Sequence, residues 1–421
     1  MSCTITSTLN RYCSADKLAQ EHVAITSEIY RSHTGVNRDE WSEVVQNKNC
    51  FLSLGYLSSL EQVHDEGLEI RYVVFRRGER VVGVGAFQIT HFTTSEDAYQ
   101  NSFLKFANRV ASFFRGKHVH NILICGNAIA TGEHGYRFSI ELDQKTISLL
   151  IADVMKRISE QEKENGRKIC AMVVKDFYQD SFGVADELSG AGFKKFQVDH
   201  NMVMPVLKEW TTFNHYLEAM NTKFRTKAKA ALKKSSAVNI VTHNSESISE
   251  YIGRLEVLYN NVYSKADFRL GKLSMAALPL LLQQVPQNFT IKTYAVGETI
   301  AGFMTAMKCG DTLEAHVIGI DYDLNRDHAI YQRMLYDYVE LAIQNFCDRI
   351  VFGRTAAEIK STIGAFPVDL TCCILHQQRI SNALLSLILN YVKPSEFPQR
   401  QPYKAEVLEQ IQHEKIFSIT A

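Results

Sequence analysis

The segment 312–323, TLEAHVIGIDYD, brings together two residue types that can move a proton. Side chains alternate between the two faces of a strand, so Glu314, His316 and Ile318 share one face. A carboxylate and an imidazole on one face could take a proton from an attacking amine, one as the base and the other as its orienting partner. Polar residues satisfied by their neighbours in a sheet give the same pattern, so both interpretations stand.

A second candidate site lies in the segment 349–367, RIVFGRTAAEIKSTIGAFP, where an apolar strand passes into a short helix. Thr355 and Glu358 fit the Thr-x-x-Glu capping box and predict that the helix begins there. Gly364 and Pro367 predict its end.

Arg354 and Lys360 stand beside this strand-to-helix junction. A helix N-terminus offers unpaired backbone N–H groups, and two cations next to it predict a site for a phosphate or a carboxylate. Alternatively, Arg354 caps a carbonyl and Lys360 is solvated.

The segment 220–236, MNTKFRTKAKAALKKSS, is predicted to be an amphipathic helix with Phe224, Ala228 and Ala231 on its apolar face. It carries six cations and no acid: Lys223, Arg225, Lys227, Lys229, Lys233 and Lys234. Unbalanced positive charge on one helix favours contact with nucleic acid, an anionic membrane or a phosphate-rich substrate, although many charge runs are only solvated.

The segment 125–138, CGNAIATGEHGYRF, is loop-like and groups Glu133, His134, Tyr136 and Arg137. It could contact a substrate or form an ordinary surface turn. The sequence contains no GxxxxGK(S/T), GxSxG or HExxH pattern, so it lacks the motifs of a P-loop, a nucleophile elbow and a zinc protease.

The elements that would position these residues occur twice. YVVFRRGERVVGVGAFQI (72–89) and YAVGETIAGFMTAM (294–307) each read as two strands joined by a Gly-Glu turn. Helical sequence precedes each hairpin, and a further strand, a long helix (in 144–166 and 329–346) and another strand follow it. The repeated order predicts a duplicated α/β domain whose sheets are mixed and mainly antiparallel.

A chain of 421 residues is longer than one core usually supports, and we place the boundary at Pro205: an N-terminal domain 1–205 and a C-terminal domain 206–421 with the basic helix. Lys+Arg and Asp+Glu are equal at 46 each, so any charged surface must be local. The nine cysteines are scattered and form no CxxC pair, which predicts reduced thiols and no metal site. The first residues lack a signal-peptide pattern, and we expect a cytoplasmic protein without a membrane span.

Several segments resemble the Fem-like branch of the GNAT acyltransferase superfamily, in particular the bacterial N-acyltransferases. The specific part of the match is FGRTAAEIKS with GA and P following, in 352–367, and the basic segment 221–234 supports it. NKNCFLSLGYLSSLE, GNAIATGEHGYRF, VVKDFYQD and FPQRQPYK fit the same group. The resemblance extends from about Trp41 to Lys404.

This resemblance implies two GNAT domains in tandem and the transfer of an acyl or aminoacyl group from a thioester or aminoacyl donor to an amine. It implies acyl-CoA, acyl carrier protein or aminoacyl-tRNA as co-substrate, with no permanently bound cofactor. The sequence departs from the family where GNAT enzymes hold the coenzyme A pyrophosphate, because the matching segment 321–334, DYDLNRDHAIYQRM, contains no glycine.

We therefore expect an N-acyltransferase that acts on an amine-bearing small molecule or lipid precursor by direct attack on the acyl carbonyl. Glu314 or His316 would take the proton of the ammonium group, and Tyr331 would protonate the leaving thiol. Arg354, Thr355 and Lys360 would hold an anionic group, and Lys223, Arg225, Lys227 and Lys229 would guide the donor in. The alternative is a non-catalytic GNAT-like protein that binds RNA or another polyanion through its basic helix.

Overall fold

The structure is a computed structural model that describes residues 24–46, 48–63, 67–92, 120–265, 270–390 and 392–413. The first residues, in which we find no signal-peptide pattern, lie outside the described part, as do Cys3 and Cys13. All the described cysteines are free thiols. In the same residues, no cluster of three or more His, Cys, Asp or Glu side chains is placed to hold a metal ion. None of the described helices combines the length and apolar character that a membrane span requires.

The described strands form one sheet of 13 strands in the order β1-β2-β3-β4-β6-β13-β7-β12-β11-β10-β9-β8, with β5 paired to β3. Their bounds are β1 (Ile25–Tyr30), β2 (Leu68–Arg77), β3 (Arg80–Phe92), β4 (His120–Cys125), β5 (Tyr136–Phe138), β6 (Ile169–Phe177), β7 (Lys194–Pro205), β8 (Val238–Thr242), β9 (Phe289–Val296), β10 (Thr299–Cys309), β11 (Thr312–Ile320), β12 (Arg349–Val351) and β13 (Phe366–His376). The pairs β4–β6 and β11–β12 are parallel and the other pairs are antiparallel, which confirms the predicted fold class.

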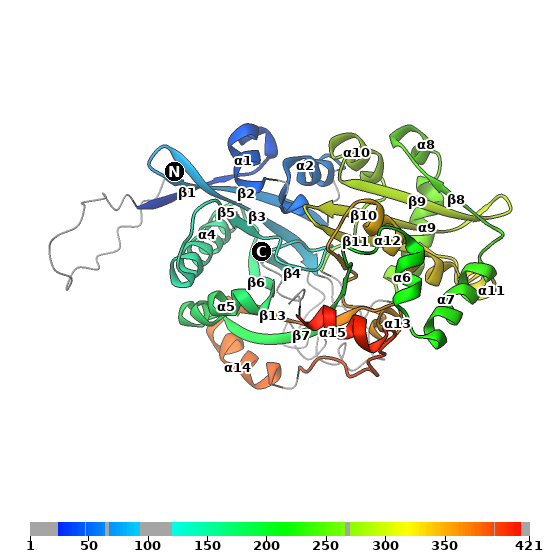
Figure 1. Cartoon of the computed structure of the whole chain (residues 1–421). Helices are drawn as coiled ribbons and strands as arrows, with labels where there is room; N and C mark the ends of the chain where they lie inside the picture. Colours follow the sequence, from blue (N-terminus) through cyan, green and yellow to red (C-terminus); the bar gives the residue numbers. More distant parts are fainter. Residues whose placement is uncertain are drawn as a thin grey trace.

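Helices flank both faces of this sheet (Figure 1). Their bounds are α1 (Arg38–Val45), α2 (Leu54–Gln62), α4 (Gln144–Glu164), α5 (Phe182–Leu188), α6 (Phe213–Ala219), α7 (Thr222–Lys234), α8 (Ser245–Ser249), α9 (Ile252–Tyr263), α10 (Ala277–Gln284), α11 (Tyr322–His328), α12 (Ile330–Gln344), α13 (Ala357–Thr362), α14 (Arg379–Leu389) and α15 (Ala405–His413). The predicted long helices correspond to α4 and α12, and the predicted basic helix corresponds to α7.

The two predicted hairpins are present as β2–β3 and β9–β10. Each reverses through a two-residue turn, between Arg77 and Arg80 and between Val296 and Thr299. The turn glycines, Gly78 and Gly297, have φ values of 61° and 59°, a left-handed conformation that glycine adopts at little cost. Matching residues therefore make matching turns in the two halves of the chain, which we call the first half (up to residue 205) and the second half (from residue 206).

The last strands of the two halves are exchanged. β13, from the end of the chain, lies between β6 and β7, while the end of β7 pairs with β12 through Val203, Met204 and Pro205. Each half thus receives a strand from the other, and the sheet runs without a break through Pro205. The division of the chain at that residue stays a prediction.

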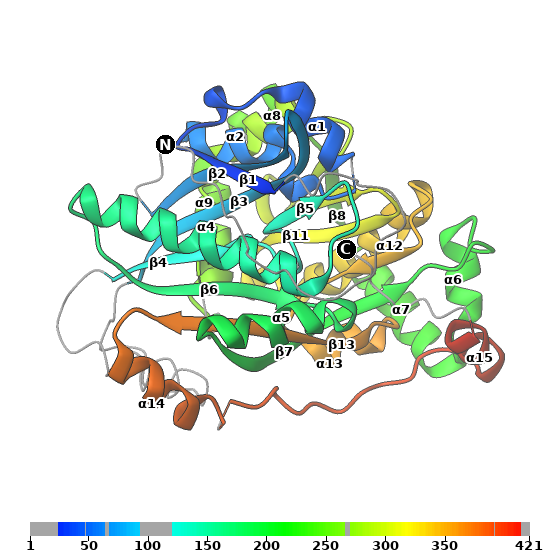
Figure 2. The ribbon, with the colours of Figure 1, turned by 90° about the vertical axis from the view of Figure 1, so that its left-hand side faces the viewer.

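One apolar core joins the halves on one face of the sheet. It contains Trp41 of α1 and Leu57 of α2 from the first half, and Leu258 of α9 and Leu281 of α10 from the second. On the opposite face the core is split, with α4 and α5 over the first half and α6 and α12 over the second. Figure 2 shows the extended segment between α14 and α15 running along the underside of the molecule, from one half to the other.

Candidate functional site

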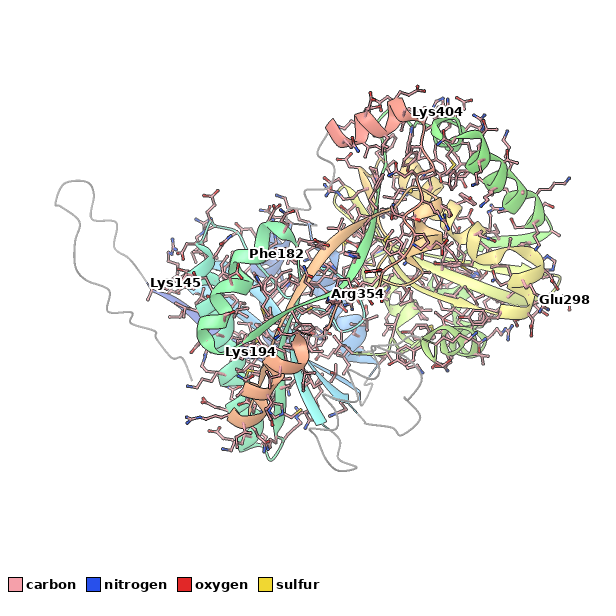
Figure 3. All side chains as sticks on the ribbon, turned by 90° about the horizontal axis from the view of Figure 1, so that it is seen from below. Lys145, Phe182, Lys194, Glu298, Arg354 and Lys404 are labelled. Carbon is pink, nitrogen blue, oxygen red and sulfur yellow. The ribbon has the colours of Figure 1, made fainter. Side chains whose placement is uncertain are left out.

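A cavity of about 600 Å³ lies where the two halves meet. Figure 3 shows Arg354, one of its lining residues, near the middle of the molecule, whereas Glu298 of the second hairpin lies at the outer edge. The lining residues are Phe51, 128–131, Lys175 and 198–200 from the first half, and Tyr259, Val262, Tyr263, Lys265, Leu270, Gly271, 314–318, 351–357, Ser395 and Phe397 from the second.

The cavity opens where β11 and β12 separate. These parallel strands pair only at the start of β11, where Glu314 lies opposite Val351. Beyond Glu314, β11 continues to Ile320 with no described strand paired on that side. The separation leaves one edge of β11 open, so residues 314–318 and the junction after β12 line the same space.

Glu314 lines this cavity and is 9% exposed. Within the described part of the chain its carboxyl makes no hydrogen bond. Burial, reinforced by nearby Cys50 and opposed by Arg349, raises the pKa of Glu314 well above its usual value. The carboxyl therefore keeps its proton to a higher pH than an exposed glutamate does.

His316 lines the same cavity, and its ring is held from the first half of the chain. Asn127 accepts the backbone N–H groups of Ile129 and Ala130 through Oδ1, which fixes its amide so that Nδ2 donates to the Tyr56 hydroxyl at 3.2 Å. The Tyr56 hydroxyl lies 3.2 Å from His316 Nε2, and because its oxygen already accepts from Asn127, we infer that it donates its own hydrogen to Nε2. His316 Nδ1 is buried and has no hydrogen-bond partner among the described residues.

This arrangement predicts that the proton of His316 is on Nδ1 and that the lone pair of Nε2 is occupied. Burial, with a smaller contribution from His134, lowers the pKa of His316 to about 3. A neutral imidazole whose acceptor nitrogen is engaged is poorly suited to take a proton. Of the two residues expected to act as base, Glu314 has the better geometry.

Arg354 and Thr355 also line the cavity, as expected of residues at the strand-to-helix junction. Arg354 Nη1 lies 3.6 Å from Asp176 Oδ1, and its guanidinium makes no hydrogen bond within the described residues. The predicted capping box is wrong. The helix begins at Ala357 after Ala356, whose φ of 55° is left-handed, and no side chain caps it. Thr355 is exposed and precedes that turn.

The expectation that Lys360 faces the same site as Arg354 needs correction. Lys360 is 4% exposed, does not line the cavity, and donates from Nζ to the carbonyls of Phe352 at 2.6 Å and Gly353 at 3.2 Å. Burial lowers the pKa of its ammonium group to about 7. Lys360 instead connects α13 to the end of β12 through these hydrogen bonds, and so stabilises the backbone next to Arg354.

Tyr331 and the basic helix lie away from the cavity. Tyr331 packs against the core under the second half, and burial raises the pKa of its hydroxyl. On α7, Lys223, Lys227 and Lys229 are exposed and Arg225 is partly exposed, and none of the four lines the cavity. The structure therefore does not bring the cations of α7 together with Glu314 and Arg354.

The loop 125–138 contributes to the cavity through its residues 128–131. Its polar side chains hold the loop in place, because Glu133 accepts hydrogen bonds from Tyr178 N and Ser181 Oγ, and His134 contacts Asn49. The segment is thus neither a simple surface turn nor a row of free polar groups.

Lys175 and Asp176 are adjacent site residues to which the sequence analysis gave no role. Lys175 lines the cavity and donates to Ala130 O and to Asp176, and Asp176 also accepts the N–H of Gly132. Burial would raise the pKa of Asp176, but the charges of Lys175 and Arg354 outweigh it and lower the pKa to about 2. The signal in the sequence is a charged pair inside the apolar strand KICAMVVKDF.

At the start of each of the two crossover helices, α4 and α12, a side chain accepts one backbone N–H group of the first turn. In α12, the N–H of Tyr331 donates to Asn325 Oδ1 of the preceding helix α11 at 2.7 Å. In α4, Asp143 caps the first turn by accepting the N–H of Thr146 at 2.9 Å. Each contact engages one of the N–H groups of a first turn, and the N-cap residue of α12, Ala329, adds no side-chain cap.

No protein-family model matches the sequence, and no curated protein is significantly similar to it. Solved structures are similar in fold. A crystal structure of FemX has 11% sequence identity and a TM-score of 0.51, and the match covers 86% of this chain and 100% of that one. A tandem GNAT protein from the clavulanic acid biosynthesis pathway has 8% identity and a TM-score of 0.48 over 84% and 98% of the two chains. L-PGS from Bacillus licheniformis has 9% identity and a TM-score of 0.42 over 73% and 87%.

At 11% identity the likeness to FemX concerns the fold. It spans both halves of the chain, as does the resemblance found in the sequence from Trp41 to Lys404. The chain therefore has the FemX fold, and the Fem-like fold expected from its motifs is confirmed.

Proposed function

We propose that the protein is an N-acyltransferase whose reaction takes place in the cavity between the two halves. The observation that carries the proposal is the Glu314 carboxyl, which is nine-tenths buried, lines the cavity and makes no hydrogen bond within the described residues. A buried polar group without a partner is costly, and a ligand in the cavity would supply the partner. The FemX fold is compatible with this activity.

In the proposed reaction, the nitrogen of an amine attacks the carbonyl carbon of a thioester or ester donor. The C–N bond forms, the C–S or C–O bond breaks, the amine loses one proton and the leaving group gains one. Glu314, whose pKa burial raises, gives a proton to the leaving group and recovers one from the nitrogen. Glu314 thus takes over the role expected of Tyr331, which does not line the cavity.

Arg354 and Thr355 would bind an anionic group of a substrate. The guanidinium has donors to spare, because its contact with Asp176 is long at 3.6 Å. Acyl-CoA, acyl carrier protein and aminoacyl-tRNA remain the donors to test.

The test is donor consumption by the purified protein with a panel of primary amines. Thiol release from acyl-CoA and acyl carrier protein and deacylation of aminoacyl-tRNA are followed against protein-free controls. At least one donor should be consumed faster with the protein, and Glu314→Gln should slow that reaction about a hundredfold or more. The proposal fails if no donor is consumed, or if the variant matches the wild type.

The exposed cations of α7 favour a second candidate function, which is the binding of a polyanion such as RNA without catalysis. Lys223, Lys227 and Lys229 face solvent outside the cavity, so they could bind whether or not the cavity is active. Changing these three lysines to glutamate should abolish tRNA binding. Binding is measured between 50 and 200 mM salt, because protein contacts with phosphates weaken strongly over this range. Unchanged binding would remove α7 from consideration.

A further inference from the structure

Two groups of opposite character face the same cavity without a close partner. Glu314 presents a buried carboxyl that makes no hydrogen bond to the described residues, and Arg354 presents a guanidinium whose one charged contact there is the distant Asp176. Glu314 belongs to β11 and Arg354 to the turn after β12, so both are anchored to the sheet.

Arg354 differs in this from three other basic residues that line the cavity. Lys175 donates to Ala130 O and to Asp176. Lys265 places its ammonium 3.3 Å from the centre of the Tyr322 ring. His200 Nδ1 lies 2.9 Å from Asp369. The two lysines are engaged by the protein and His200 has an acidic neighbour, whereas the Arg354 side chain is 22% exposed and keeps donors for a ligand.

The register of the sheet limits the distance between the two groups. Glu314 lies opposite Val351, and neighbouring strands are about 4.8 Å apart. Arg354 follows three residues later, and three residues span at most about 11 Å. The two Cα atoms are therefore within about 16 Å of each other, a distance that one small molecule and the two side chains can bridge.

Much of the remaining cavity wall is apolar or aromatic. Phe51 and Ala130 come from the first half, and Tyr259, Val317 and Phe397 come from the second. Such a wall favours a hydrocarbon or an aromatic ring between two polar ends.

We infer that the acceptor of the acyl group carries both an amine and an anionic group, joined by an apolar spacer. Its amine binds at Glu314, where the reaction occurs, and its carboxylate or phosphate binds Arg354. This inference rests on the proposed function and narrows the acceptor to one chemical class. It also gives the protein a means of rejecting simple amines, because an amine without the anionic end leaves Arg354 unpaired.

Equilibrium binding tests this inference without an acyl donor. Isothermal titration at pH 8 compares 6-aminohexanoate, 6-aminohexylphosphonate, hexylamine and hexanoate, which share one spacer. At least one of the two bifunctional probes should bind about tenfold or more tightly than hexylamine and hexanoate. The tighter of the two shows whether a carboxylate or a phosphate group is preferred. The inference is overturned if neither exceeds hexylamine.

Variants test which residue binds each end of the bifunctional probe, Arg354 the anionic group and Glu314 the amine. Arg354→Gln should remove the tenfold advantage of the bifunctional probe and leave hexylamine affinity unchanged, whereas Glu314→Gln should weaken hexylamine and leave hexanoate unchanged. Lys156→Gln, an exposed change on α4, is the matched control and should alter none of these affinities. An equal loss for all probes in Arg354→Gln would contradict the assignment, and the wild-type comparison remains decisive if that variant does not fold. Failure of the proposed function would be seen in a different experiment, the donor-consumption assay, in which no donor would be consumed with any amine.

Discussion

The hydroxyl of Tyr56 lies 3.2 Å from Nε2 of His316, although the two residues are 260 positions apart in the sequence. Tyr56 belongs to α2 of the first half and His316 to β11 of the second. The contact therefore links the halves at the wall of the cavity. It also predicts that Nδ1 of His316 carries the proton.

The substitution Tyr56→Phe should allow the proton of His316 to occupy either ring nitrogen. Without the hydroxyl, Nε2 loses its donor and either nitrogen can hold the hydrogen. In the wild type, ¹⁵N shifts of the His316 ring should show a protonated Nδ1 and an unprotonated Nε2, and in the variant they should move toward a mixture. The His316→Gln variant identifies the signals of this ring, because they are absent from its spectrum. A wild-type ring with its proton on Nε2 would contradict the hydrogen-bond chain from Asn127.

Glu314→Gln should change the pH dependence of the reaction as well as its rate. The amine attacks only when neutral, so the rate rises with pH, and in the wild type this rise levels off where Glu314 loses its proton. Because the pKa of Glu314 is raised, the levelling should lie well above the usual range of a glutamate. In the glutamine variant the slower reaction should keep rising until the amine itself is fully neutral. Profiles of kcat/KM against pH make the comparison, and identical shapes would exclude Glu314 as the proton carrier.

Local patterns in the sequence predicted the elements and part of the site. The Gly-Glu turns at Gly78 and Gly297 located both hairpins, because a left-handed glycine between two apolar strands has few other uses. Alternation along β11 placed Glu314 and His316 together, and the junction after β12 brought Arg354 to the same cavity.

The remaining features depend on contacts between distant segments, which local patterns do not encode. Lys360 turned inward because two carbonyls at the end of β12 accept its ammonium group. The prediction of a capping box was wrong because Ala356 adopts a left-handed conformation. The helix therefore begins at Ala357, two residues after Thr355. The exchange of β7 and β13 is a choice of strand partners, and period-two alternation is the same for either partner.

Lys360 should make stability depend on pH. Its pKa is about 7 in the folded protein and about 10.4 when exposed, so the unfolded chain binds more protons between these values. Stability should therefore rise with pH across this window, by up to about 1.4 kcal/mol per pH unit, and the cost of charging Lys360 is fully present below pH 7. Lys360→Met removes this contribution. Urea unfolding of both proteins from pH 7.5 to 9.5 gives the difference, and parallel stabilities would show that Lys360 titrates normally.

The contact between Gly364 and Tyr403 ties the C-terminal segment to α13, and substitutions on its two sides should act in opposite directions. The Tyr403 hydroxyl is buried and has no hydrogen-bond partner within the described residues, so Tyr403→Phe should stabilise the protein by about 1 kcal/mol. Gly364 has a φ of 107°, and a methyl group there would lie 1.9 Å from that hydroxyl. Gly364→Ala should therefore cost about 2 kcal/mol or more, from backbone strain and overlap together.

The double variant separates these two causes. Removing the hydroxyl relieves part of the overlap but leaves the ring carbons and the strained backbone, so Tyr403→Phe should recover only part of the loss in Gly364→Ala. Denaturant unfolding of the four proteins measures the coupling. Strict additivity would mean that the side chains do not meet, and the packing of Tyr403 under the end of α13 would then be wrong.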